Sequence, residues 1–209
     1  TQIEEAREGT ITPQMASVAA AERIEADDLR QSIADGEAVI MTRGMSSLGI
    51  GRGLRTKVNV NLGTSTAIIR PEDEVRKARI AESVGADTIT DLSAGGDIPA
   101  IRRAIFSATT LPITTVPIYQ TAAEIGIDRM TADGILATIQ RQAEEGISSV
   151  VIHAVEPETI DAALDGKRVM GIVSKGGSIT AAYMLTREAE NPFLEHFDEI
   201  LSILKEHDI

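Results

Sequence analysis

The chain has 209 residues, a formal net charge of −12 and no cysteine. Its length and apolar content allow a globular core, whereas its acidic balance argues against a nucleic-acid partner, because a polyanion would be repelled. The lack of cysteine excludes disulfides and cysteine-held iron–sulfur clusters within these residues. No run of about 18 apolar residues predicts a membrane span, and no signal-peptide pattern is present, so we expect a cytoplasmic protein without a membrane partner.

Residues 1–52 are interpreted as a small N-terminal lead-in domain. Thr12 and Pro13 form a good N-cap and first-turn pair for a helix. Two helices and a short strand are predicted here, over residues 13–23, 26–34 and 38–41. Residues 42–53 are rich in small side chains and are interpreted as a loop or domain boundary.

From Lys57 onward, strand patterns alternate with helix patterns. Strands are predicted over residues 58–62, 87–92, 113–119, 149–153 and 169–173. Helices are predicted over residues 71–84, 97–108, 131–145, 157–164, 178–190 and 192–206. This alternation, without hairpin signals, indicates an α/β fold with a parallel sheet.

The mean step between these strands is about 28 residues, which suits a (β/α)8 barrel of about 250 residues. Residues 53–209 would therefore supply about five of the eight units, as a partial barrel that binds substrate. A five-stranded doubly wound sheet is the structural alternative.

The fifth predicted strand runs into a loop of small residues that opens a helix. The loop consists of Ser174, Lys175, Gly176, Gly177 and Ser178. Free N–H groups and the helix dipole at such a place favour an anion, often a phosphate, and Lys175 adds a positive charge. An ordinary strand-to-helix turn that needs glycine is the alternative interpretation.

Polar side chains stand at the end of each predicted strand. They are Asn61, Asp91, Ser93, Tyr119, His153 and Ser174. In a parallel barrel these ends meet at one rim, so we expect a site for a small, phosphorylated, nitrogen-rich ligand. Polar residues also occur wherever a strand reaches solvent, and a single rim histidine is more often structural than a ligand. No metal-ligand spacing and no Ser/His/Asp arrangement stands out.

Six blocks of this chain, in this order and spacing, resemble the phosphomethylpyrimidine synthase (ThiC) family of thiamine biosynthesis. The blocks are Gly53–Gly63, Asp91–Gly96, Thr115–Gln120, Ile152–Ala154, Gly171–Ser178 and Glu190–Pro192. The resemblance runs from about Thr10 to the last residue. It implies a (β/α)8 barrel behind a small N-terminal domain, in a homodimer.

The resemblance also implies an activity and a substrate. The family converts 5-aminoimidazole ribotide to hydroxymethylpyrimidine phosphate as a radical S-adenosylmethionine carbon–carbon lyase that uses a [4Fe-4S] cluster and binds zinc. By position, the family's substrate contacts fall on Asn61, Thr90, Tyr119, His153, Ser174, Lys175 and Gly176. The phosphate is expected at residues 174–178, with the imidazole end towards Asn61, Tyr119 and His153.

Three residues depart from the family pattern. Thr90 stands in place of methionine, Lys175 in place of arginine, and Val155 in place of glycine. Lysine keeps the charge but loses the bidentate fork for phosphate. The cluster cysteines, the zinc histidines and the family's Asp-Gly-Leu-Arg loop come later in the family's chains and are absent here. We therefore assign no catalytic residue and no metal ligand, and expect this chain to be inactive alone.

Two other functions remain open at this point. Thr90 and Lys175 also fit a paralogue that makes a different product, such as hydroxybenzimidazole, from the same ribotide. The third hypothesis is a non-catalytic, ribotide-binding chain.

Overall fold

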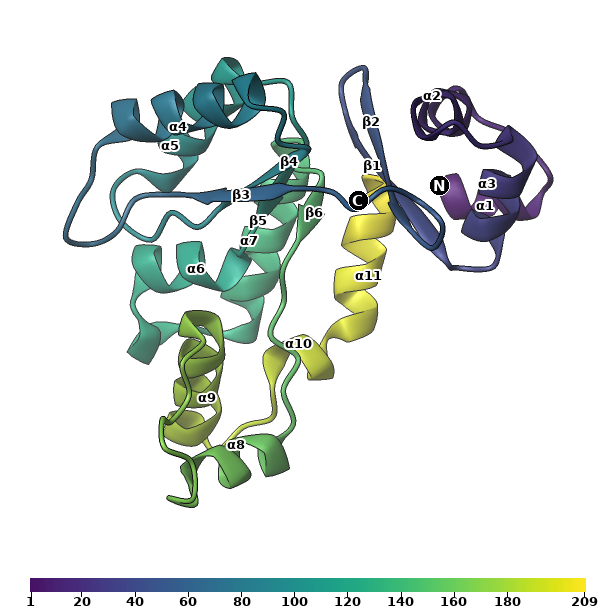
Figure 1. Cartoon of the computed structure of the whole chain (residues 1–209). Helices are drawn as coiled ribbons and strands as arrows, with labels where there is room; N and C mark the ends of the chain where they lie inside the picture. Colours follow the sequence, from purple (N-terminus) through teal and green to yellow (C-terminus); the bar gives the residue numbers. More distant parts are fainter.

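The computed structural model describes residues 1–209 and begins with a helical N-terminal part followed by a β-hairpin (Figure 1). Its elements are α1 (Gln2–Arg7), α2 (Pro13–Glu22), α3 (Ala26–Ala34), β1 (Ala38–Arg43) and β2 (Ser46–Gly51). Met15, Val18, Leu29 and Ile33 form the centre of a separate hydrophobic core beneath the hairpin. Thr12 caps α2 by accepting a 3.1 Å hydrogen bond from the Met15 N–H, as its sequence predicts.

The hairpin corrects the prediction of a loop over residues 42–53. β1 and β2 pair antiparallel, with Ala38 opposite Gly51 and Arg43 opposite Ser46. Gly44 has φ +56°, a conformation that favours glycine and turns the chain between the strands. The small residues of β2 hid its strand character, because they carry little of the β-branched pattern that predicts a strand.

The remaining residues form the expected alternation of strands and helices. The strands are β3 (Asn59–Leu62), β4 (Thr88–Asp91), β5 (Ile113–Thr115) and β6 (Ser149–Val150). The helices are α4 (Pro71–Ser83), α5 (Ile98–Ala108), α6 (Pro117–Ile125), η1 (Ile127–Arg129), α7 (Ala132–Glu144), α8 (Pro157–Leu164), α9 (Lys175–Arg187), α10 (Pro192–Glu195) and α11 (Phe197–Glu206). None of the helices is both long enough and apolar enough to cross a lipid bilayer.

The sheet has four parallel strands in the order of the chain, β3-β4-β5-β6. The expectation of a parallel α/β sheet is confirmed, but the fifth strand and a closed barrel are not observed. The strand order has no reversal, which a doubly wound sheet requires. On one face of the sheet, Ile89, Ile105 and Ile113 pack with α4 and α5 in a hydrophobic core.

The predicted strands over residues 113–119 and 149–153 are shorter in the structure, and the predicted strand over residues 169–173 is absent. Strand β5 stops at Thr115 because Pro117 begins α6, where proline suits the first helical turn. The predicted strand 169–173 is not formed at all: Val169 is fully exposed, and Met170 and Val173 are also exposed. A strand needs a neighbour to pair its N–H and C=O groups, and these residues have none.

The C-terminal helices shift relative to their predicted bounds. Helix α9 begins at Lys175, three residues earlier than expected, because Ser174 caps it. The predicted helix over residues 192–206 is two helices, α10 and α11, with a break at His196. The largest hydrophobic core joins α6, α7, α9 and these helices around Ile139, Tyr183 and Phe193.

Two polar contacts connect the N-terminal part to the rest of the chain. The guanidinium of Arg43 donates to the carbonyl oxygens of Phe106, Thr109 and Leu111 at the end of α5. Glu22 forms a buried ion pair with Lys57 at 2.7 Å. Burial raises the pKa of Glu22, but bonds from Lys57 and the Arg55 N–H outweigh this, so the net pKa is lowered.

Candidate functional site

The first turn of α9 presents unpaired backbone donors. The Ser174 side chain accepts a 3.1 Å hydrogen bond from the Gly177 N–H, and the Ser174 carbonyl accepts from Ser178 N–H at 2.8 Å. The N–H groups of Lys175 and Gly176 precede the first intrahelical bond and have no partner. This geometry is suited to an anion, because unpaired donors and the helix dipole act at the same end.

Lys175 and Tyr119 lie together at this helix end. The Lys175 ammonium lies 4.8 Å from the centroid of the Tyr119 ring, a cation–π distance. Lys175 is exposed, whereas Tyr119 is half-buried and packs against the largest core. Tyr119 was predicted at the end of a strand but lies in the first turn of α6, so α6 and α9 position this pair.

His153 packs directly against the backbone of Gly176. A Cβ atom added at Gly176 would lie 2.0 Å from Cε1 of the imidazole, so only glycine fits. His153 follows β6, which ends at Val150, and its carbonyl accepts a 2.8 Å bond from Asn191. The sequence analysis assigned His153 to the imidazole end of the ligand, whereas in the structure its ring touches the proposed phosphate loop.

Burial sets the charge of His153. It lowers the pKa of the imidazole below its usual range, which favours the neutral ring. The Nδ1 atom is buried without a hydrogen-bond partner. A proton on Nε2 avoids a buried, unpaired N–H and leaves Nε2 as a donor.

Asn61 and Thr90 belong to a different surface, the polar face of the sheet. Asn61 pairs in register with Thr90, and Thr90 with Thr114. Asn59 connects the first two, since it donates to the Asn61 oxygen and accepts from the Thr90 hydroxyl, both at 2.9 Å. No hydrogen bond or ion pair joins Asn61 or Thr90 to the α9 group, so the predicted residues form two clusters.

This polar face includes residues that the sequence interpretation missed. Asn59 lies on it, and the Thr114 and Ser149 hydroxyls lie 2.7 Å apart across β5 and β6. The signal was present, because alternate residues in β3, β4 and β5 are polar. Strands of a parallel sheet covered on both faces are usually apolar throughout, so one polar face indicates a surface kept for water or ligand.

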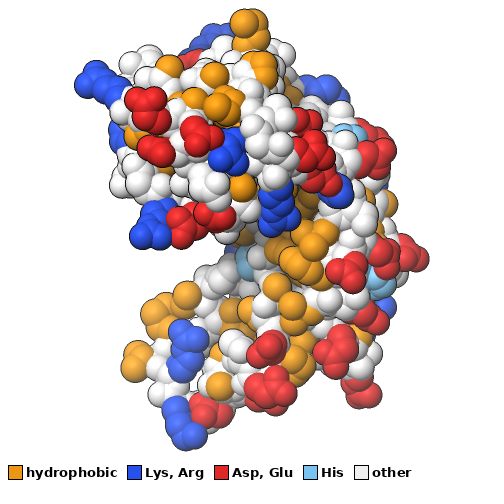
Figure 2. Space-filling view, turned by 90° about the vertical axis from the view of Figure 1, so that its right-hand side faces the viewer, with side chains coloured by type: hydrophobic (Ala, Val, Ile, Leu, Met, Phe, Trp, Pro, Cys, Tyr) orange, Lys and Arg blue, Asp and Glu red, His pale blue; other side chains and the backbone are white.

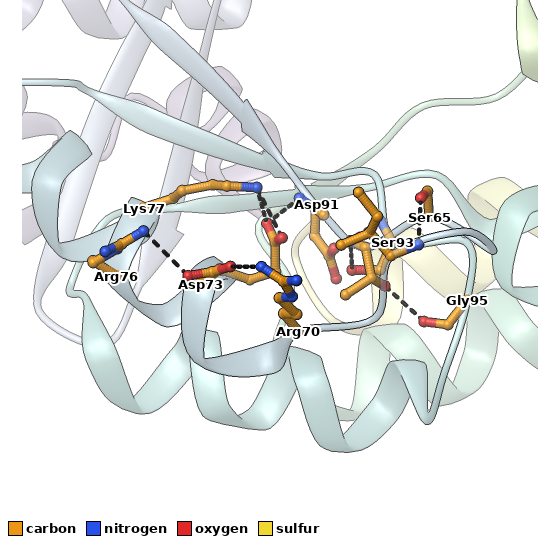
Figure 3. A network of polar contacts seen from close by, with 12 residues as sticks. Ser65, Arg70, Asp73, Arg76, Lys77, Asp91, Ser93 and Gly95 are labelled. Atoms are coloured by element: carbon orange, nitrogen blue, oxygen red, sulfur yellow. Dashed lines mark hydrogen bonds and ion pairs between the residues drawn. The ribbon is translucent and has the colours of Figure 1, made fainter.

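Asp91 and Ser93 were expected at the rim but are structural. Figure 3 shows both in a polar network between the loops that follow β3 and β4. The Asp91 carboxylate accepts from the Ser93 N–H at 2.9 Å, and the Ser93 hydroxyl accepts from Thr64 N–H at 3.3 Å. Burial raises the pKa of Asp91, partly offset by the Ser93 bonds and the charge of Arg102. Both side chains are buried and are held by bonds within this network.

Two cavities lie away from these residues. One, of about 580 Å³, is lined by α1, β1 and α11, and the other, of about 590 Å³, lies beside Arg43 and Thr109. Figure 2 shows a deep hollow in one side of the molecule, with histidine atoms at its back.

A family model and the curated relatives point to the same family. The model of the Radical SAM ThiC family matches residues 1–209. A phosphomethylpyrimidine synthase of Dehalococcoides mccartyi (strain CBDB1) is 44% identical over all of this chain and 51% of its own length. A phosphomethylpyrimidine synthase of Pyrococcus furiosus (strain ATCC 43587 / DSM 3638 / JCM 8422 / Vc1) is 41% identical over all of this chain and 51% of its own length. A 5-hydroxybenzimidazole synthase of Geobacter sulfurreducens is 42% identical over all of this chain and 50% of its own length. The chain thus spans about half the length of the curated relatives it matches.

Proposed function

The chain belongs to the Radical SAM ThiC family, and we propose that it is the ribotide-binding part of a phosphomethylpyrimidine synthase-like enzyme. One observation carries the proposal: Lys175, Tyr119 and His153 lie together at the start of α9, with Lys175 over the Tyr119 ring and His153 against Gly176. These residues are three of the seven that the family resemblance assigns to substrate. The substrate is 5-aminoimidazole ribotide, and the product is hydroxymethylpyrimidine phosphate.

We assign the ribotide phosphate to the start of α9. The N–H groups of Lys175 and Gly176 and the Lys175 ammonium supply three donors for its oxygens. His153 supports the Gly176 backbone and offers Nε2–H at the same place. The imidazole end of the ribotide is assigned to the polar sheet face around Asn61 and Thr90, where amide and hydroxyl groups can bond ring nitrogens and the amine.

The iron–sulfur cluster and the zinc of the family do not fit the residues of this chain. A radical S-adenosylmethionine enzyme uses an iron–sulfur cluster, which requires thiolate ligands, and this chain has no cysteine. No group of three His, Asp or Glu side chains is placed to hold a metal ion either, zinc included. We therefore assign binding and orientation of the ribotide to this chain, and no step of the radical chemistry.

Phosphate titration by calorimetry tests the site. Lys175→Ala should weaken phosphate binding by about 10- to 150-fold, the value of one charge-assisted hydrogen bond of about 1.5–3 kcal/mol. His153→Ala should weaken it too, because the Gly176 backbone loses its support. Asn61→Ala is the matched control and should leave phosphate affinity unchanged while weakening ribotide binding. Unchanged phosphate affinity in both Lys175→Ala and His153→Ala would place the phosphate elsewhere.

We expect no synthase activity from the chain alone, because it lacks any thiolate for a cluster. The measurement is product formation by mass spectrometry after incubation with ribotide, S-adenosylmethionine and reductant. Hydroxymethylpyrimidine phosphate above the level without protein would contradict this expectation.

A second candidate function is the synthesis of a hydroxybenzimidazole from the same ribotide. The similarity to the Geobacter relative favours it, as do Thr90 and Lys175, which replace the usual methionine and arginine. The same product analysis, carried out on an enzyme completed with the second half of a relative, separates the two functions. The larger number of similar synthases makes the pyrimidine product our first choice.

A further inference from the structure

A buried polar network lies under α6, beside the Tyr119–Lys175 pair. Its centre is the Gln120 amide, whose oxygen accepts from the Arg102 guanidinium of α5 and, at 2.7 Å, from Gln142 of α7. The oxygen of Gln142 accepts in turn from the Thr115 hydroxyl at 2.7 Å. Each of these four side chains is only 1% exposed.

Stability alone does not account for this network. Burial lowers the pKa of Arg102, which reflects the cost of desolvating its charge. Its Nε atom lies 2.9 Å from a Glu145 oxygen, yet neither atom makes a well-directed hydrogen bond. Well-packed apolar side chains often stabilise such a place as well or better. A buried charge held with incomplete bonding is better explained by the specific geometry that it fixes.

The geometry that the network fixes is the rotation of α6 about its axis. Gln120 is bonded from α5 on one side and from α7 on the other, and its own Nε2 donates to Glu124 one turn later at 2.7 Å. Consecutive residues on a helix point about 100° apart. With Gln120 held towards α5 and α7, Tyr119 is directed towards the start of α9, where Lys175 lies over its ring.

We propose that Gln120 is a positioning residue that holds Tyr119 against Lys175 through the Arg102–Gln120–Gln142–Thr115 network. The proposal about the Tyr119–Lys175 geometry stands on the network itself. Its consequence for ligand affinity rests on the proposed function of the α9 site.

The chain makes the geometry directly measurable. It has two tyrosines, Tyr119 and Tyr183, and no tryptophan, so Tyr183→Phe leaves Tyr119 as the sole tyrosine. In that background, we expect a nuclear Overhauser effect in NMR spectra between the Tyr119 ring and the Lys175 side chain. Gln120→Ala should abolish it in the folded protein, because α6 loses its bonds to both neighbouring helices.

An exchange variant tests the network by rescue. In Gln120→Glu/Glu124→Gln the acceptor for Arg102 and Gln142 is kept, and the bond between positions 120 and 124 is reversed in direction. It should restore the Tyr119–Lys175 signal. Thr88→Val is the matched control, because Thr88 is also buried and bonds only the Pro112 carbonyl at 2.9 Å. Thr88→Val also removes a buried hydrogen bond, and it should leave the Tyr119–Lys175 signal intact.

The outcomes separate the two levels of the proposal. Three outcomes would overturn the positioning role. The signal could persist in folded Gln120→Ala, it could be absent from the Tyr183→Phe parent, or it could be lost equally in Thr88→Val. If Gln120→Ala does not fold, the isosteric Thr115→Val decides, with a weakened signal expected and an unchanged one contradicting the proposal. Phosphate affinity should also fall in Gln120→Ala, by about 2- to 30-fold. A parent that binds no phosphate contradicts the proposed function while the NMR result still tests the positioning role.

Discussion

At the scale of single residues, the absence of a side chain at Gly176 decides how the α9 site is built. The His153 ring occupies the place that a Cβ atom of residue 176 would take. It packs against the backbone whose N–H groups, those of Lys175 and Gly176, we assign to the phosphate. The glycine is therefore required by close packing rather than by an unusual φ angle, since its φ is not positive.

Gly176→Ala should lower the free energy of unfolding by about 1–3 kcal/mol, because the added methyl group must push the imidazole out of its place. Gly171→Ala is the matched control: Gly171 has open space around it and an ordinary φ, so the change should stay within about 0.5 kcal/mol. Urea denaturation of both variants measures the difference. Equal stabilities would show that His153 moves aside freely and does not support the loop.

At the scale of elements, most helix starts carry a local signal in the sequence, either a proline in the first turn or a capping side chain. Pro71, Pro117, Pro157 and Pro192 each open a helix, and Thr12, Asp97, Thr131, Ser174 and Asn191 each cap one. The placement of the hairpin was not locally specified. It depends on Arg43, which reaches from β1 to three carbonyls at the end of α5 and lies 4.8 Å from the Phe106 ring centroid.

Arg43→Met should destabilise the chain by about 1.5–3 kcal/mol, because charge-assisted bonds to one carbonyl in the last turn of α5 and two carbonyls just after it are lost. Arg52→Met serves as control, since Arg52 is exposed and pairs only with Glu37 at the surface, and it should cost less than about 1 kcal/mol. Chemical denaturation followed by circular dichroism gives both values. If Arg52→Met lowers the free energy of unfolding as much as Arg43→Met does, the Arg43 contact has no special role in stability.

At the scale of the whole molecule, the sheet is open and one of its faces is polar. Strands β3 and β6 are edges, and the exposed apolar run at residues 169–173 lies beyond the sheet. Exposed strand edges and apolar runs favour pairing with another chain. We retain from the sequence the proposal of a homodimer.

We expect the chain to self-associate, with a sedimentation mass that rises with concentration in analytical ultracentrifugation. Val173→Asp should reduce the effect, because it charges the exposed apolar run. Leu164→Asp is the control, since Leu164 is exposed but lies outside that run. A constant monomer mass at all concentrations would contradict the expectation.

The sequence by itself determined the alternation of strands and helices from residue 57 onward, the parallel pairing of the sheet and the family. These features depend on residues close in the chain: alternating apolar positions, N-caps, prolines in first turns and glycines after helices. Short-range patterns therefore specify them. Helix α6 was not predicted, because the strand pattern over residues 113–119 runs on into its first turn, and the start of α9 was predicted three residues too late.

Only the tertiary structure decided which site residues meet. His153 lies against Gly176, and Tyr119 lies against Lys175, whereas Asn61 and Thr90 share the polar sheet face. Residues 169–173 have the composition of a strand but remain unpaired, because strand formation requires a neighbour that this sheet does not supply. Contacts between distant segments depend on how the helices are oriented and packed against one another, and a local pattern of residues does not specify that orientation.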